Sequence, residues 1–266
     1  MKLTDKLVVV TGAGSGIGRA TALAFAAKGA RVAACDVDQA RLDALATELG
    51  DRAQVIRKVD VSDRAQMASF ADAVGTPDVV VNNAGVAVGG SFLETTLDDW
   101  DWLLGVNLKG VVHGCHFFVP RMVERGSGGH VVNLSSILGI YPAPKVTAYV
   151  ASKFAVLGLS QSLRAELAPH RIGVTAICPG MIATQIVADG RMSGGVGTNK
   201  GKMVSTFRDR GLAPEKVAEA ILDAVHSNPA VRTVGKDAWA IHQLVKVAPR
   251  AVEKLGTRLS RRFGGG

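Results

Sequence analysis

Short apolar runs alternate with longer segments of helical periodicity along the chain. The runs Val8-Val9-Val10 and Val79-Val80-Val81 are continuous rather than alternating, which is typical of parallel strands that are buried on both faces. The pattern predicts strands at residues 7–10, 31–35, 55–59, 79–81, 130–134, 174–178 and 231–234. It predicts helices at residues 17–28, 39–49, 64–74, 98–124, 148–168 and 214–224. We therefore expect a single α/β domain over residues 1–266, built as a Rossmann-type doubly wound parallel sheet.

Turn-forming and polar residues directly follow six of these strands. They are Thr11-Gly12, Asp36, Asp60, Asn82-Asn83, Ser135-Ser136 and Pro179-Gly180. In an open α/β sheet, ligands bind in the crevice at the carboxyl ends of the strands. We therefore expect the functional site at this edge of the sheet.

A glycine-rich turn joins the first predicted strand to an alanine-rich helix. Glycines in such a turn allow tight geometry and let the main chain approach a pyrophosphate, which the helix N-terminus attracts. The expected cofactor contacts here are Gly12, Gly14, Ser15, Gly16, Ile17 and Gly18. A tight turn without a ligand is the alternative interpretation.

Asp36 ends the second strand, where a carboxylate can accept hydrogen bonds from the adenosine ribose and would repel a 2′-phosphate. No basic partner for that phosphate is evident, because Ser15 occupies the glycine turn and Val37 follows the acid. We therefore expect NAD(H) rather than NADP(H). In the alternative interpretation Asp36 caps the next helix, although Asp38 is better placed for that role.

The end of the third strand offers a further cofactor contact. Asp60 and Val61 are expected near the adenine ring. Ser62 and Asp63, which follow, are candidate caps of the next helix.

Tyr149 and Lys153 are four residues apart, so on a helix they share one face. A neighbouring ammonium favours phenolate over phenol, so we expect Lys153 to lower the tyrosine pKa and to make Tyr149 a general acid or base. Ser136 leaves the fifth strand thirteen residues upstream and offers a hydroxyl to a substrate oxygen. The alternatives are an ordinary amphipathic helix for the pair and turn chemistry for the serine.

Taken together, these motifs resemble the short-chain dehydrogenase/reductase family, in its compact single-domain branch. The matching features are TGxxxGIG at residues 11–18, NNAG at 82–85, Asn107, Ser136, YxxxK at 149–153 and Pro179-Gly180. They run in the family's order from about residue 5 to residue 184. The spacing of Tyr149 and Lys153 does not match the enoyl-reductase-like branch, and Ser15 does not match the extended branch.

The resemblance implies a role for each matched residue. Ser136 would position the substrate oxygen, Tyr149 would transfer the proton, and Lys153 would bind the nicotinamide ribose. Asn107 would hold a water molecule behind Lys153. Further implied cofactor contacts are Asn83, Ala84, Gly85, Pro179, Gly180 and Thr184. A homodimer through helices 98–124 and 148–168 is also implied, and a homotetramer is an open alternative.

Composition bears on metal binding, cellular location and nucleic-acid binding. Three widely spaced cysteines support neither a disulfide framework nor a zinc cluster, so we expect no metal and a cytoplasmic location. The apolar stretch at residues 7–10 is too short for a signal peptide or a membrane span. The net charge is +8, but residues 246–262 hold six basic residues and one acid, so we expect no nucleic-acid groove in the body of the domain.

Two segments fall outside the family motifs. Residues 185–212 are rich in glycine, methionine and basic residues and are expected to form a lid over the substrate, or else a flexible surface insertion. Residues 237–266 form a basic C-terminal extension with an apolar stripe at helical spacing. We expect the stripe to pack on the protein itself or on a second subunit, and peripheral membrane contact is the less favoured alternative.

The favoured function is hydride transfer between NAD(H) and a secondary alcohol or ketone. A non-catalytic NAD-sensing protein on the same fold is one alternative, and a membrane-recruited lipid or steroid dehydrogenase is another. Retention of Asn107, Ser136, Tyr149 and Lys153 argues against the first alternative.

Overall fold

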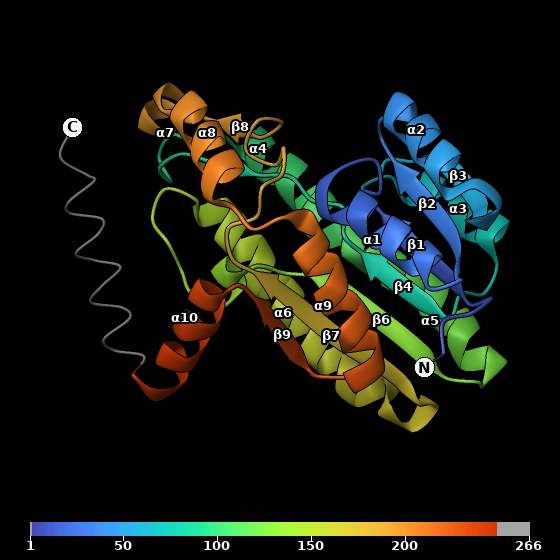
Figure 1. The fold of residues 1–266 in the computed structure, drawn as a ribbon. Coiled ribbons are helices and arrows are strands. Elements are labelled where there is room, and N and C mark those ends of the chain that lie inside the picture. The colour runs from blue at the N-terminus through green and yellow to red at the C-terminus, as the bar shows by residue number, and fades with distance from the viewer. Residues whose placement is uncertain (1, 249–266) are drawn as a thin grey trace.

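The computed structural model describes residues 2–248, which form an α/β domain (Figure 1). Within these residues, seven strands form one parallel sheet in the order β3-β2-β1-β4-β6-β7-β9. Their bounds are β1 Leu7–Thr11, β2 Arg31–Asp36, β3 Ala53–Lys58, β4 Val79–Asn82, β6 Gly129–Leu134, β7 Ile172–Pro179 and β9 Val231–Val234. The strand order reverses between β1 and β4, which makes the sheet doubly wound, as predicted.

Helices cover both faces of the sheet (Figure 1). Alternate residues of each central strand point to opposite faces: Val8 and Val10 join one buried cluster, and Val9 joins the other. The first cluster is covered by α1 Gly16–Ala27, α2 Gln39–Leu49 and α9 Pro214–Ser227. The second is covered by α3 Arg64–Val74, α5 Gly110–Arg125 and α6 Thr147–Leu167. Two covered faces explain the continuous valine runs in the sequence.

The helix predicted at residues 98–124 is interrupted, which corrects the sequence interpretation. The structure has α4 Leu97–Leu104, one π-helical turn at Gly105–Lys109, and then α5. The π-turn inserts an extra residue into the helical ladder and so changes the direction in which side chains point. Asn107 lies inside this turn, fully buried.

The segment at residues 185–212 is folded rather than a plain loop. It contains the short strand β8 Arg191–Met192 and the helices α7 Gly194–Thr198 and α8 Lys200–Arg210. β8 pairs in parallel with β5 Val88–Gly89, which follows the sheet strand β4. Figure 1 shows this segment beside α4 at one end of the molecule. We refer to residues 185–212 as the lid segment.

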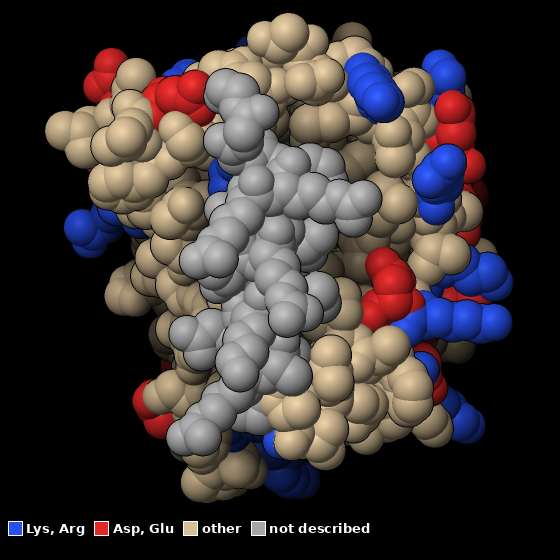
Figure 2. Space-filling model, turned by 90° about the vertical axis from the view of Figure 1, so that its left-hand side faces the viewer, with Lys and Arg blue, Asp and Glu red and all other residues tan. Residues whose placement is uncertain are grey.

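The chain after β9 forms α10 Lys236–Val247, which confirms a helix at the start of the C-terminal extension. The rest of the expected apolar stripe, from residue 251 onward, lies outside the described residues. Among the residues that the structure describes, no helix is long and apolar enough to cross a membrane. On the face seen in Figure 2, the visible basic and acidic side chains are intermixed rather than gathered into a basic stripe.

Candidate active site

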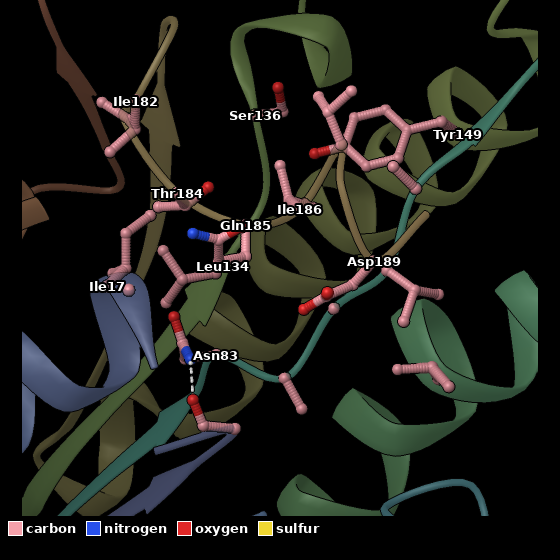
Figure 3. A pocket seen from close by; sticks show the side chains of 18 of the residues that line it. Ile17, Asn83, Leu134, Ser136, Tyr149, Ile182, Thr184, Gln185, Ile186 and Asp189 are labelled. Atoms are coloured by element: carbon pink, nitrogen blue, oxygen red, sulfur yellow. Dashed lines mark hydrogen bonds between the residues drawn. The ribbon is translucent and has the colours of Figure 1, made fainter. Parts of the chain in front are cut away.

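A cleft of about 740 Å³ lies at the carboxyl edge of the sheet. Most of the predicted site residues line it, from Gly12 in the glycine turn to Thr184 after β7. Figure 3 shows Ile17, Asn83 and Thr184 toward one side of the cleft and Ser136 and Tyr149 toward the other. Three predicted residues do not line the cleft: Gly14, Gly18 and Asn107. They contact residues that do, as described below.

The glycine turn has a conformation that requires glycine. Gly12 and Gly16 have φ angles of 63° and 50°, in the left-handed region. A Cβ atom on Gly12 would lie 2.7 Å from the Cα of Ala84, and one on Gly18 would overlap the carbonyl oxygen of Gly12. The turn is therefore packed closely against the segment that follows β4.

The turn and the α1 N-terminus fit a dinucleotide pyrophosphate. Ser15 occupies the N-cap position of α1, but its side chain makes no capping hydrogen bond, and no acidic residue lies in the first helical turn. The first backbone N–H groups of the helix and its positive dipole end are thus available to an anion. The absence of a Cβ on Gly16, next to Thr184, keeps the approach to this end open.

Asn83 holds the turn in place. Its side-chain nitrogen donates to the carbonyl oxygens of Thr11 and Gly12, at 2.9 and 3.0 Å, and its backbone N–H donates to the Thr11 hydroxyl. Ala84 donates to the same hydroxyl. The side chain of Asn83 therefore ties two strand ends together, a role that its position after a strand did not reveal.

Asp36 lines the cleft, and its carboxylate is part of the turn. One oxygen accepts from the Gly14 N–H at 2.8 Å, and the other accepts from the Asp38 N–H at 3.0 Å. The helix cap is Asp38, whose side chain accepts from the Arg41 N–H. The structure thus confirms Asp38 as the cap and leaves Asp36 lining the cleft beside the glycine turn.

Arg41 is a basic residue that lines the cleft beside the glycine turn and was not predicted from the sequence. Its guanidinium lies 3.5 Å from the Ser15 hydroxyl, 3.1 Å from an Asp38 carboxylate oxygen and 3.5 Å from Asp189 of the lid segment. The expectation that no basic group stands near a 2′-phosphate is therefore wrong. Helix α2 places Arg41 beside the glycine turn. The spacing of three residues between Asp38 and Arg41 indicates an ion pair on one helix face and could have predicted this position.

Asp60 and Val61 also line the cleft. The Asp60 carboxylate accepts from both the backbone N–H and the hydroxyl of Ser62. Asp63 is the cap of α3, accepting from the N–H groups of Ala65 and Gln66, as predicted for one of the two candidates. Asp60 therefore shapes the loop that follows β3 at the edge of the cleft.

Tyr149 and Ser136 meet at the other end of the cleft. Burial raises the pKa of Tyr149 to about 12, and a hydrogen bond with Ser136 partly opposes this rise. The Ser136 hydroxyl also accepts from the Leu138 N–H at 3.1 Å, which orients it at the start of a 3-10 turn. The expected lowering of the tyrosine pKa by Lys153 is not borne out, because desolvation of the phenol dominates.

Lys153 is buried beneath Tyr149. Its ammonium lies 5.6 Å from the centre of the Tyr149 ring and donates to the Leu134 carbonyl oxygen at 2.9 Å. Burial lowers the pKa of Lys153 to about 8. Ser135, which the sequence grouped with Ser136, instead donates its hydroxyl to the Lys153 carbonyl oxygen and so ties the second turn of α6 to the residue that follows β6.

Asn107 holds the wall of the cleft from the π-turn. Its side-chain oxygen accepts from the Val86 N–H at 2.8 Å, and its nitrogen donates to the Val86 carbonyl at 3.0 Å and the Ser152 hydroxyl at 3.2 Å. Gly85 lies between Asn107 and the Lys153 ammonium, since a Cβ on this glycine would be within 3.5 Å of both. Asn107 thus links the NNAG segment to the helix that carries Tyr149 and Lys153.

The remaining candidates lie where β7 ends. Pro179, Gly180 and Thr184 all line the cleft. Gly180 packs against Asp237 of α10, whose carboxylate would lie 2.6 Å from a Cβ at that position.

Within residues 2–248, no cluster of His, Cys, Asp or Glu is arranged to hold a metal ion.

Comparison with known proteins places these motifs in context. A model described as "short chain dehydrogenase" matches residues 6–193. The chain is 43% identical over 260 residues to "Probable oxidoreductase EphD" of Mycobacterium tuberculosis, which covers 93% of this chain and 44% of that protein. The chain therefore spans less than half the length of this relative. It is 37% identical over 262 residues to "Putative oxidoreductase SadH" of the same organism, covering 94% and 93% of the two chains.

Solved structures give the same picture. A short-chain dehydrogenase/reductase from Burkholderia phymatum in complex with NAD has a TM-score of 0.87 at 29% identity, covering 94% of this chain and 96% of that chain. A short-chain dehydrogenase from Burkholderia cenocepacia in complex with NADP has a TM-score of 0.81 at 26% identity, covering 96% and 99%. Similar structures therefore hold either dinucleotide.

Proposed function

The chain belongs to the short-chain dehydrogenase/reductase family, and we propose that it transfers a hydride between NAD(H) and a secondary alcohol or ketone, with Tyr149 as the proton-transferring group. The observation that carries the proposal is the arrangement of Ser136, Tyr149 and Lys153 in one cleft with the glycine turn. When bound, the nicotinamide dinucleotide supplies or accepts the hydride.

Each residue has a defined task in this proposal. Ser136 and the Tyr149 hydroxyl bind the substrate oxygen, and Tyr149 gives it a proton during reduction or removes one during oxidation. A pKa near 12 keeps the phenol protonated at neutral pH, which suits the reductive direction. The Lys153 ammonium favours the phenolate once the proton has left. Asn107 keeps the Lys153 helix and the NNAG segment in register.

We propose NAD(H) as the preferred dinucleotide. The Asp36 carboxylate faces the adenosine end and would accept from ribose hydroxyls while repelling a 2′-phosphate. Arg41 would favour that phosphate, but Asp38 and Asp189 already contact its guanidinium. Three carboxylates against one guanidinium favour the cofactor without the additional phosphate.

We also propose a homodimer in the cytoplasm. Val112 on α5 and Phe154 on α6 are apolar side chains left 41% and 40% exposed on the helices that the family resemblance assigns to subunit contact. Cys35, Cys115 and Cys178 are free and buried, as in proteins of reducing compartments.

The function is tested with the two tyrosines of the chain. Tyr149→Phe removes the proton-transferring hydroxyl, so ketone-dependent NADH oxidation should fall at least about 100-fold while NADH fluorescence still reports binding. Tyr141→Phe is the matched control, because the buried Tyr141 hydroxyl has no hydrogen-bond partner in the described structure. Wild-type turnover by Tyr149→Phe, or no turnover of any alcohol or ketone by the unmodified protein, contradicts the proposal.

A further inference from the structure

The end of the cleft around Tyr149 is apolar. The lining side chains here include Val88, Trp102, Ile137, Met192, Met203 and Phe207. They come from β5, α4, the 3-10 turn after β6, and β8 and α8 of the lid segment. Tyr149 itself packs against a small core of Val88, Leu103 and Ala148. We refer to this end of the cleft as the apolar chamber.

The lid segment is attached directly to the chamber wall. The Met192 sulfur packs so closely on β5 that a Cβ on Gly89 would lie 2.6 Å away from it. The guanidinium of the neighbouring Arg191 lies 4.1 Å from the centre of the Trp102 ring and 3.2 Å from an Asp99 carboxylate oxygen. Met192 lines the cleft and Arg191 does not, so the positive charge of Arg191 lies outside the chamber.

The charges that line the whole cleft are unfavourable to an anion. Among the described lining residues the basic ones are Lys153 and Arg41. Lys153 is committed to the Leu134 carbonyl and to Tyr149, and Arg41 stands at the adenosine end between two carboxylates. Asp189 and Asp237 also line the cleft and add negative charge. Figure 3 shows Asp189 and Ile186 projecting from the lid segment into the cleft.

We propose that the substrate is a neutral, apolar secondary alcohol or ketone, whose carbon groups occupy the apolar chamber beneath the lid segment. This inference rests on the proposed function and adds the substrate class. A carboxylate or phosphate on the same carbon skeleton would lose its water shell next to apolar groups, without a cation to replace it. Met192 and Met203 have flexible side chains that adapt to different apolar shapes.

The first test compares two ketones of equal length, 2-octanone and 7-oxooctanoate, in NADH-dependent reduction. We expect kcat/KM for the neutral ketone to exceed that for the carboxylate by about 100-fold or more, mainly through KM. Trp102 lines the chamber, so its fluorescence can report binding there. We expect saturable binding of the neutral ketone and none of the carboxylate. Equal kcat/KM values, or a preference for the carboxylate, overturn the substrate class while leaving the hydride-transfer function intact. Turnover of neither ketone also overturns the substrate class, whereas the hydride-transfer function is contradicted only when no alcohol or ketone at all is turned over.

The second test moves a charge into the chamber. Met203→Lys should raise kcat/KM for 7-oxooctanoate by about tenfold and lower that for 2-octanone, because the ammonium would offer the missing partner. Gly201→Lys places the same charge on α8 at an exposed position with open space around it, and should change neither value. If both variants behave alike, the chamber does not hold the distal part of the substrate and the inference fails.

Discussion

The Lys153 ammonium lies 5.6 Å from the centre of the Tyr149 ring, and burial moves the pKa values of the two groups apart, to about 8 for Lys153 and about 12 for Tyr149. Both shifts disfavour charge, so a nearby cation has a large effect on the phenol. In oxidation Tyr149 must be deprotonated, and the rate should therefore rise with pH. In reduction it must be protonated, and the rate should fall as pH rises through its pKa.

Lys153→Met should therefore shift the pH profile of alcohol oxidation upward by at least about one unit, because the phenolate loses its neighbouring cation. The measurement is kcat/KM against pH, with NADH affinity from fluorescence in parallel. A purely structural role for Lys153 would lower the rate at every pH and leave the profile in place.

Asp36 and Arg41 act in opposite directions on cofactor choice. Asp36→Asn removes the charge but keeps an oxygen for the Gly14 N–H, so the turn should persist. We expect the ratio of kcat/KM for NADPH over NADH to rise by about tenfold or more, since the Arg41 guanidinium 3.5 Å from Ser15 is then less opposed. Adding Arg41→Ala should cancel the gain. An unchanged ratio in Asp36→Asn would mean that Asp36 does not face the ribose.

Much of the fold could be predicted, because strand and helix periodicities are local properties of the sequence. The valine runs of β1 and β4 report burial on two faces, and Asp38 and Asp63 mark the helix starts by their spacing. The π-turn at Gly105–Lys109 could not be predicted in this way, because its neighbours have ordinary helical periodicity. Its formation depends on tertiary contacts of Asn107 with Val86 and Ser152.

The site divides in the same manner. Motif positions predicted residues that line the cleft at the strand ends, since Gly12, Asn83 and Ser136 come just after β1, β4 and β6. Arg41, Trp102 and Met203 were missed because they lie within helices and reach the cleft only through tertiary packing. The effect of burial on Tyr149 was also missed, because desolvation depends on surrounding atoms rather than on the YxxxK spacing.

His130 should make the fold sensitive to acid. The ring is buried on β6, 3.0 Å from the Thr175 hydroxyl, and burial lowers its pKa to about 4. Between pH 6.5 and 4 the unfolded chain binds a proton that the folded chain does not, so stability is lost as pH falls through this window. The loss amounts to about 3 kcal/mol at the acid end.

Urea unfolding of His130→Gln at several pH values tests this expectation. The variant should be less stable at neutral pH but should lose less stability on acidification, whereas the exposed His170→Gln should follow the unmodified protein. Parallel curves for His130→Gln and the unmodified protein would assign the acid sensitivity to other groups.

Gly18 and Gly158 give opposite predictions for the same change to alanine. Both lie in helices, α1 and α6, so alanine raises intrinsic helix propensity at each by about 1 kcal/mol. At Gly158 a Cβ meets nothing within 4 Å, and Gly158→Ala should raise the free energy of unfolding by up to that amount.

At Gly18 a Cβ overlaps the Gly12 carbonyl oxygen and the Asn83 amide, so α1 must move away from the turn. Gly18→Ala should destabilise the fold by about 1–3 kcal/mol and weaken NADH binding, because the helix N-terminus no longer meets the pyrophosphate site. Thermal unfolding and NADH fluorescence titrations measure both quantities, and normal NADH affinity in Gly18→Ala would show that contact between α1 and the turn is not required for the cofactor.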